Sequence, residues 1–277
     1  MENITVGYDG SPAADSALRW VATRSLMRPT RVTVAGVDDA VHSTQEMLLR
    51  IRAGRDLLRQ LNPDAEVTTQ LIKGRPARAL STGTADADLL VIGVHTDAPT
   101  RAALMGFTAL RLAARAAVPV VLVPEGWSPS VGPVVIGYDV DGSSDAALAF
   151  AQDEAVEDKR TLRIVHVWDG VGEEAHRLHG VVVDGAAEQA RHNAPALEAV
   201  PVLVAGAPAP ALMKESADAS LLVIGGHHRG VWMGGLLGAL SWELIGTVHV
   251  PLCVVSPSEE SLEDDTDART EEYAGVL

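Results

Sequence analysis

Two long loops, each following a short apolar run, contain residue types that could bind an anion. The loop at 93–107 reads GVHTDAPTRAALMGF, and the loop at 225–239 reads GGHHRGVWMGGLLGA. A glycine-rich loop that leads into a helix can present several backbone N–H groups to phosphate oxygens. The glycines could instead serve only a tight connection, and the loop at 225–239 taken alone leaves both interpretations open.

Four further residues of interest lie at the ends of other apolar runs: Asp9, Asp139, Val37 and Val167. In an open parallel sheet, ligands bind beyond the carboxyl ends of the strands, where the strand order reverses. A carboxylate at such a strand end could act as a general base, but it more often contacts a ribose or adenine, or caps a helix. The sequence therefore favours a binding site over a catalytic site at the carboxyl ends of the strands.

The elements that must position these loops occur twice in the chain. ITVGYD at 4–9 recurs as VVIGYD at 134–139, an offset of 130, and LLVIG at 89–93 recurs unchanged at 221–225, an offset of 132. Segments that recur in the same order at a nearly constant offset indicate duplication of one unit. We expect a first half at residues 1–126 and a second half at 133–256, joined by a Gly/Pro/Ser-rich linker.

Short apolar runs alternate with longer amphipathic stretches, which is the pattern of βαβ units and a parallel sheet. We expect strands at 3–8, 31–37, 66–72, 88–93 and 120–123, and in the second half at 134–138, 161–167, 201–204, 221–225 and 252–255. Helices of the first half are expected at 12–27, 43–61, 76–86 and 106–116.

The second helix of the second half is the hardest element to place. It lies somewhere in 172–199, a segment in which Gly180, Gly185 and Pro195 could each interrupt it. The first helix of the chain has a clearer start, because Ser11 can act as the N-cap and Pro12 suits the first helical position.

Several of these features together resemble the universal stress protein family. They are G-Y-D at the first strand end, LLVIG, a glycine thirteen residues after the glycine of that strand, and a final V-P-φ-φ-V strand, where φ is apolar. In that family the ATP-binding signature is G-x₂-G-x₉-G followed by Ser or Thr. The second half places Gly225, His228, Gly238 and Ala239 on this signature, and the first half places Gly93, Thr96, Gly106 and Phe107 on it.

Both halves keep the spacing of the signature but not its residue types. His228 has a Cβ, which is costly where a glycine takes a positive φ or lets a phosphate approach. Ala239 lacks the hydroxyl of the family residue, although Ser241 retains one nearby and Arg229 could contact phosphates directly. Phe107 departs further in the first half. We therefore expect a nucleotide site in the second half and a degenerate one in the first.

The resemblance also implies roles for the other strand ends. Asp9 or Asp139 would hold the adenine or ribose, and the backbone near Val37 or Val167 would border the base. The implied function is an adenine-nucleotide-responsive binding module in stress response, with ATP or AMP as ligand, and Mg²⁺ could accompany ATP. Two alternatives stay open: an interaction protein whose loops have lost the ligand, and, with less support, a slow ATP hydrolase.

Composition limits the other function classes. The formal net charge is −15, and the segment from Ser256 to Leu277 alone has eight acidic residues against one arginine. We expect residues 257–277 to be a disordered, solubilising tail. An acidic body argues against nucleic-acid binding, and His227–His228 lacks the spacing of a metal site. Without an apolar span or leader, and with Cys253 as the single cysteine, a cytoplasmic protein that does not associate with membranes is expected.

The expected fold class is α/β, with two tandem doubly wound parallel five-stranded sheets of the universal stress protein or adenine nucleotide alpha hydrolase-like type. The resemblance implies the strand order 3-2-1-4-5 in each half. It also implies that the last strands, at 120–123 and 252–255, pair with each other in a pseudo-dimer of the two halves. A homodimer of the whole chain is a further possibility.

Overall fold

The computed structural model describes residues 1–39, 43–84, 86–95, 108–139, 144–168, 170, 172–226, 239–245, 247 and 249–256. In the first half the strands are β1 (Glu2–Gly7), β2 (Thr30–Asp38), β3 (Glu66–Lys73), β4 (Leu89–Val94) and β5 (Val120–Pro124). The helices are α1 (Pro12–Met27), α2 (Thr44–Leu61) and α3 (Pro76–Gly83); residues 108–113 are also helical.

The second half repeats this order. Its strands are β6 (Val134–Gly137), β7 (Leu162–Trp168), β8 (Ala199–Ala205), β9 (Leu221–Gly225) and β10 (Leu252–Val255). Its helices are α5 (Asp145–Glu157), α6 (Glu173–Asn193), α7 (Pro208–Glu215) and α8 (Ala239–Ile245). The expected strands agree with these bounds to within two residues at each end, and 221–225 and 252–255 agree without any difference.

Helix starts follow local capping chemistry. Ser11 accepts a hydrogen bond from the backbone N–H of Ala14 and Pro12 opens α1, as expected. Helix α6 runs through Gly180 and Gly185 without a break, and Pro195 comes two residues after its end. The glycines are tolerated because α6 buries Val183, Ala186, Ala187 and Ala190 against the sheet, and tertiary packing stabilises a helix more than propensity does.

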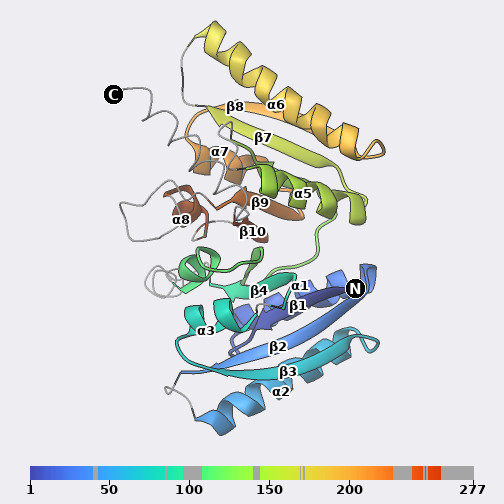
Figure 1. The fold of residues 1–277 in the computed structure, drawn as a ribbon, viewed down its shortest axis with the longest axis vertical. Coiled ribbons are helices and arrows are strands. Elements are labelled where there is room, and N and C mark those ends of the chain that lie inside the picture. The colour runs from blue at the N-terminus through green and yellow to red at the C-terminus, as the bar shows by residue number, and fades with distance from the viewer. Residues whose placement is uncertain are drawn as a thin grey trace, which may run out of the picture.

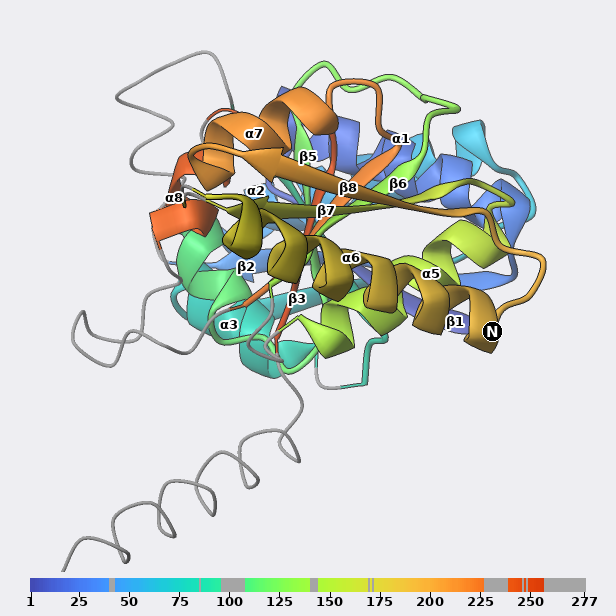
Figure 2. The ribbon, with the colours of Figure 1, turned by 90° about the horizontal axis from the view of Figure 1, so that it is seen from above.

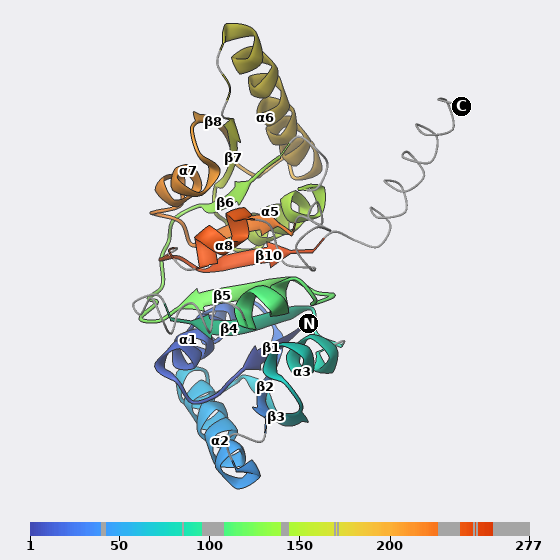
Figure 3. The same cartoon turned by 90° about the vertical axis from the view of Figure 1, so that its left-hand side faces the viewer.

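The strands form one ten-stranded sheet in the order β3-β2-β1-β4-β5-β10-β9-β6-β7-β8. Figure 1 shows this sheet from β3 at the bottom to β8 at the top, and β5 and β6 are labelled in Figure 3. Each half therefore has the expected order 3-2-1-4-5, with parallel neighbours throughout. The two five-stranded parts are not separate sheets, because β5 and β10 pair antiparallel at the centre (Figure 3).

Helices cover both faces of the sheet, so that two hydrophobic cores form. Helices α1, α2, α5 and α6 bury apolar side chains in one core, whereas α3, α7, α8 and residues 108–113 line the other. Figure 2 shows α6 on one side of β7 and β8 and α7 on the other. Buried strands explain the continuous apolar runs of the sequence. Among the described residues, no helix combines the length and the apolarity needed to cross a membrane.

Candidate nucleotide site

In each half, the strand register brings three of the expected site residues to the same edge of the sheet. Gly7 is paired with Ala35 on β2 and with Ile92 on β4, so Asp9 follows β1 at the level of Val37, and Gly93 lies beside the same strand end. The strand order reverses between β1 and β4, because β2 lies on one side of β1 and β4 on the other. This is the position at which open α/β sheets bind ligands.

The second half has the same arrangement. Gly137 is paired with Val165 on β7 and with Ile224 on β9, so Asp139, Val167 and Gly225 come to one strand edge. The backbone N–H of Asp139 donates to the Ser144 hydroxyl at 3.0 Å. Val37 and Val167 are the penultimate residues of β2 and β7 and do not lie beyond them.

The turn after β1 is held by its own polar groups. The Asp9 Oδ1 atom accepts a hydrogen bond from the Ser11 backbone N–H at 2.9 Å, and Gly10 between them has a φ of +82°. The Arg50 guanidinium of α2 donates to the Asp9 carbonyl oxygen at 2.8 Å and to a Glu46 carboxylate oxygen at 2.6 Å. Arg50 was not identified from the sequence, since no local pattern connects α2 to this turn.

Gly93 allows the first turn of α1 to lie directly on the end of β4. A Cβ atom at this position would stand 2.0 Å from the Ala13 carbonyl oxygen. No side chain can be accommodated there without moving the helix. Gly93 is therefore required for the close packing of α1 on β4.

A tyrosine ties each first strand to the following helix. The Tyr8 hydroxyl donates to Asp15 Oδ1 at 2.7 Å, and the Tyr138 hydroxyl donates to Asp145 Oδ1 at 3.4 Å. Burial, and then the neighbouring aspartate, raises the pKa of both tyrosines above the ordinary value. Both hydroxyls are therefore neutral donors, and the tyrosine of the repeated G-Y-D holds the strand end while the aspartate follows it at the edge.

A group of aromatic side chains distinguishes the second half. His166 is buried in β7; its Nδ1 lies 2.8 Å from the Tyr138 carbonyl oxygen and its Nε2 lies 2.6 Å from His179 Nδ1 on α6. Since a carbonyl only accepts, His166 donates from Nδ1 to the Tyr138 carbonyl oxygen, and the two histidine rings share the second hydrogen bond. The His179 ring also stacks on Trp168, with centroids 5.5 Å apart. This group was not identified from the sequence, because its members join a strand to the helix that was hardest to place.

The remaining expected site residues fall mostly outside the described part of the chain. Ala239 begins α8 and Ser241 lies in its first turn. The other expected site residues lie outside the described residues, in the ranges 96–107 and 227–238; they are Thr96, Gly106, His228, Arg229 and Gly238. Phe107, His227 and the expected acidic tail also lie outside the described residues. Among the residues described, no group of three or more His, Cys, Asp or Glu side chains could hold a metal ion.

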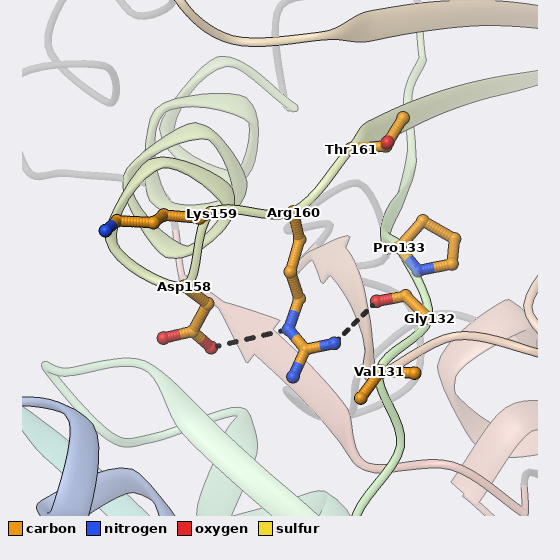
Figure 4. Close-up of a pocket in the computed structure, with 7 residues that line it drawn as sticks. All are labelled: Val131, Gly132, Pro133, Asp158, Lys159, Arg160 and Thr161. Atoms are coloured by element: carbon orange, nitrogen blue, oxygen red, sulfur yellow. Dashed lines mark hydrogen bonds and ion pairs between the residues drawn. The ribbon is translucent and has the colours of Figure 1, made fainter.

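A separate pocket of about 440 Å³ lies at the amino ends of β6 and β7 (Figure 4). It is lined by residues 131–133, which precede β6, and by Asp158–Thr161, which precede β7. Arg160 crosses it and donates to the Gly132 carbonyl oxygen at 3.1 Å. Because all of these residues stand at the amino ends of the strands, the pocket is not part of the edge formed by Asp139, Val167 and Gly225.

Comparison with known proteins agrees with this geometry. The model of the universal stress protein family matches residues 1–124 and again 131–256. Universal stress proteins of Mycobacterium bovis and Mycobacterium tuberculosis are 27% and 28% identical over 288 and 286 residues, covering 92% of this chain and 97% and 96% of theirs. The crystal structure of a universal stress protein from Archaeoglobus fulgidus has a TM-score of 0.73 at 17% identity and covers 94% of this chain and 97% of that one. The structural likeness concerns the fold alone.

Proposed function

The chain belongs to the universal stress protein family, and from this premise we propose that it is an adenine-nucleotide-responsive binding protein whose site lies in the second half. The observation that carries the proposal is the strand register. It brings Asp139, Val167 and Gly225 to one edge at the point where the strand order reverses. The glycine-rich segment that matches the family signature leaves from this edge.

The nucleoside would be held by the strand ends. A carboxylate at Asp139 can accept hydrogen bonds from ribose or adenine donors, and the backbone of Val167 can border the base. Asp9 and Val37 offer the same groups in the first half. There the Asp9 side chain also holds its own turn by accepting from Ser11, and Arg50 donates to the Asp9 carbonyl.

The phosphates would be held by the segment that starts at Gly225. By the family signature, His228, Gly238 and Ala239 would supply backbone N–H groups, Ser241 a hydroxyl, and Arg229 a charge-assisted contact. Gly93, Thr96 and Gly106 are the corresponding residues of the first half. ATP would bring Mg²⁺ with its phosphates, and AMP would not need it.

Equilibrium titration with ATP, AMP and adenosine tests the proposal. We expect saturable binding of at least one nucleotide, with a rise in the melting temperature because the ligand binds only the folded chain. Asp139→Ala should weaken binding about 10- to 100-fold, the size of one hydrogen bond to a charged group. The matched variant Asp9→Ala should leave the affinity unchanged.

Other outcomes would favour the alternatives. No binding at millimolar nucleotide would contradict the proposal and favour an interaction protein with degenerate loops, as His228 and Ala239 suggest. Equal losses in Asp9→Ala and Asp139→Ala would place sites in both halves. Phosphate release that depends on the protein would favour the slow hydrolase.

We also propose that the two halves act as domains, 1–126 and 133–256, that form an internal pseudo-dimer about the β5–β10 pair, and that the chain need not form a homodimer. The antiparallel pair of β5 and β10 supports this arrangement, because it covers the apolar last strand of each half. Light scattering on the whole chain gives the mass that tests it.

A further inference from the structure

The β5–β10 pair contains a local two-fold axis that relates the two halves. Leu252 is paired with Leu122 and Val254 with Val120, so the register is symmetric about the central pair of Val121 and Cys253. The sequence offset of 132 makes Val121 and Cys253 equivalent positions of the repeat. Residues that lie over this axis therefore face their own repeat equivalents, as in a symmetric dimer.

Two charged pairs lie over the axis and follow this rule. Helix α1 packs on β5 and α5 packs on β10, which places both helices beside the central pair. Arg24 of α1 contacts Glu154 of α5 through two hydrogen bonds of 2.5 and 2.6 Å. One turn further, Arg28 contacts Asp158 at 2.5 Å. Each contact joins residues 130 apart, which is the repeat offset of this part of the chain.

The Arg24–Glu154 pair is buried. Both side chains are 5% exposed, and Arg24 is further held by the Glu2 carboxylate, while Arg28 also reaches Glu154 at 3.3 Å. Burial alone would raise the pKa of Glu154, but hydrogen bonds and charge from the two arginines lower it. Glu154 is therefore ionised, and the two halves present opposite charges to each other.

We propose that these pairs, Arg24–Glu154 and Arg28–Asp158, select the partner of each half: a first half accepts a second half and rejects another first half. If two first halves met through β5 about the same axis, Arg24 would face Arg24 and Arg28 would face Arg28. If two second halves met through β10, Glu154 would face Glu154 and Asp158 would face Asp158. Each Arg24 would keep its own Glu2 carboxylate but lose Glu154, and each Glu154 would lose both of its arginines. Buried charges that lose their partners in this way are strongly destabilising, whereas the apolar strand pair itself does not discriminate.

The test uses full-length chains with reversed charges and two different affinity tags. Arg24→Glu places two carboxylates at the axis, and Glu154→Arg places two guanidinium groups there. Each variant alone should melt roughly 10 °C below the unchanged chain, given the cost of an uncompensated buried charge in a protein of this size. When both are expressed in one cell, the carboxylate introduced by Arg24→Glu in one chain can meet the guanidinium introduced by Glu154→Arg in the other. The unchanged Arg24 and Glu154 of the two chains can then meet reciprocally.

The expected result is a swapped dimer of twice the chain mass, in which both tags co-purify and the melting temperature returns towards that of the unchanged chain. The matched control reverses Arg31 and Glu66, an exposed pair within the first half, and should give no co-purification. A second arm replaces both pairs in one chain, by Arg24→Met and Arg28→Met with Glu154→Leu and Asp158→Leu. This chain should fold with a similar melting temperature but form mixed oligomers through like halves.

Two results would overturn the proposal. In the first, the charge-reversed chains purify separately, or remain insoluble together, with no recovery of melting temperature. In the second, the variant with both pairs replaced by apolar residues forms no more mixed oligomer than the unchanged chain over the same concentration range. Either result would show that the two charged pairs stabilise the folded chain but do not select the partner of each half.

Discussion

At the scale of single residues, Gly93 shows how a glycine of a binding signature can also be required by packing. Gly93→Ala would place a Cβ 2.0 Å from the Ala13 carbonyl oxygen. We expect a loss of about 3 kcal/mol in the free energy of unfolding, since the backbone of α1 has to move. Urea unfolding measures this loss. The control is Gly185→Ala, an exposed helical position with nothing within 4 Å of the added Cβ, which should gain about 0.5–1 kcal/mol.

The sequence could place Gly93 at the end of a strand, because the LLVIG run and its repeat are local signals. It could not indicate the contact with Ala13, which is far away in the sequence and depends on how α1 lies on the sheet. The same holds for Arg50 and the Asp9 carbonyl. An equal loss of stability in Gly93→Ala and Gly185→Ala would contradict the packing explanation.

At the scale of elements, the histidine pair fastens α6 to the end of β7. His179→Leu would leave the buried His166 Nε2 without its hydrogen-bond partner and remove the stack on Trp168. We expect a loss of about 1–3 kcal/mol, measured by thermal or urea unfolding. His192→Leu, at an exposed position in the last turn of the same helix, is the matched control and should change stability by less than about 0.5 kcal/mol. Equal losses of stability in the two variants would show that the contacts of His179 with His166 and Trp168 do not stabilise the packing of α6 on β7.

Element positions followed from the sequence where the pattern was continuous. Strands at 221–225 and 252–255 were predicted to the residue, because parallel strands buried on both faces are uninterrupted apolar runs. The bounds of α6 do not follow from the sequence pattern, because Gly180 and Gly185 lower its intrinsic helix propensity. Its buried face of Val183 and three alanines outweighs that cost, and this contribution depends on the tertiary structure.

At the scale of the whole molecule, the repeat predicted two equivalent halves, and the family resemblance predicted both the strand order of each half and which strands meet. The opposite charges, though not their contact, could be read from the same repeat, since Arg24 aligns with Glu154 and Arg28 with Asp158. A difference in charge between two aligned positions does not by itself indicate that the two residues are in contact. The hydrogen bonds between them and the register of β5 with β10 show that these positions face each other.

The axis pair also predicts how stability depends on pH. Because Arg24 and Arg28 hold the pKa of Glu154 below its ordinary value in the folded chain, the unfolded chain binds the proton first as the pH falls. The stabilisation is therefore complete above the unfolded pKa of about 4.3 and is lost as the pH falls towards the lower folded value. Melting temperatures of the unchanged chain should consequently fall more steeply below about pH 4.5 than those of Arg24→Met with Glu154→Leu. The other carboxylates are common to both chains, so parallel curves would show that Glu154 does not contribute to acid unfolding.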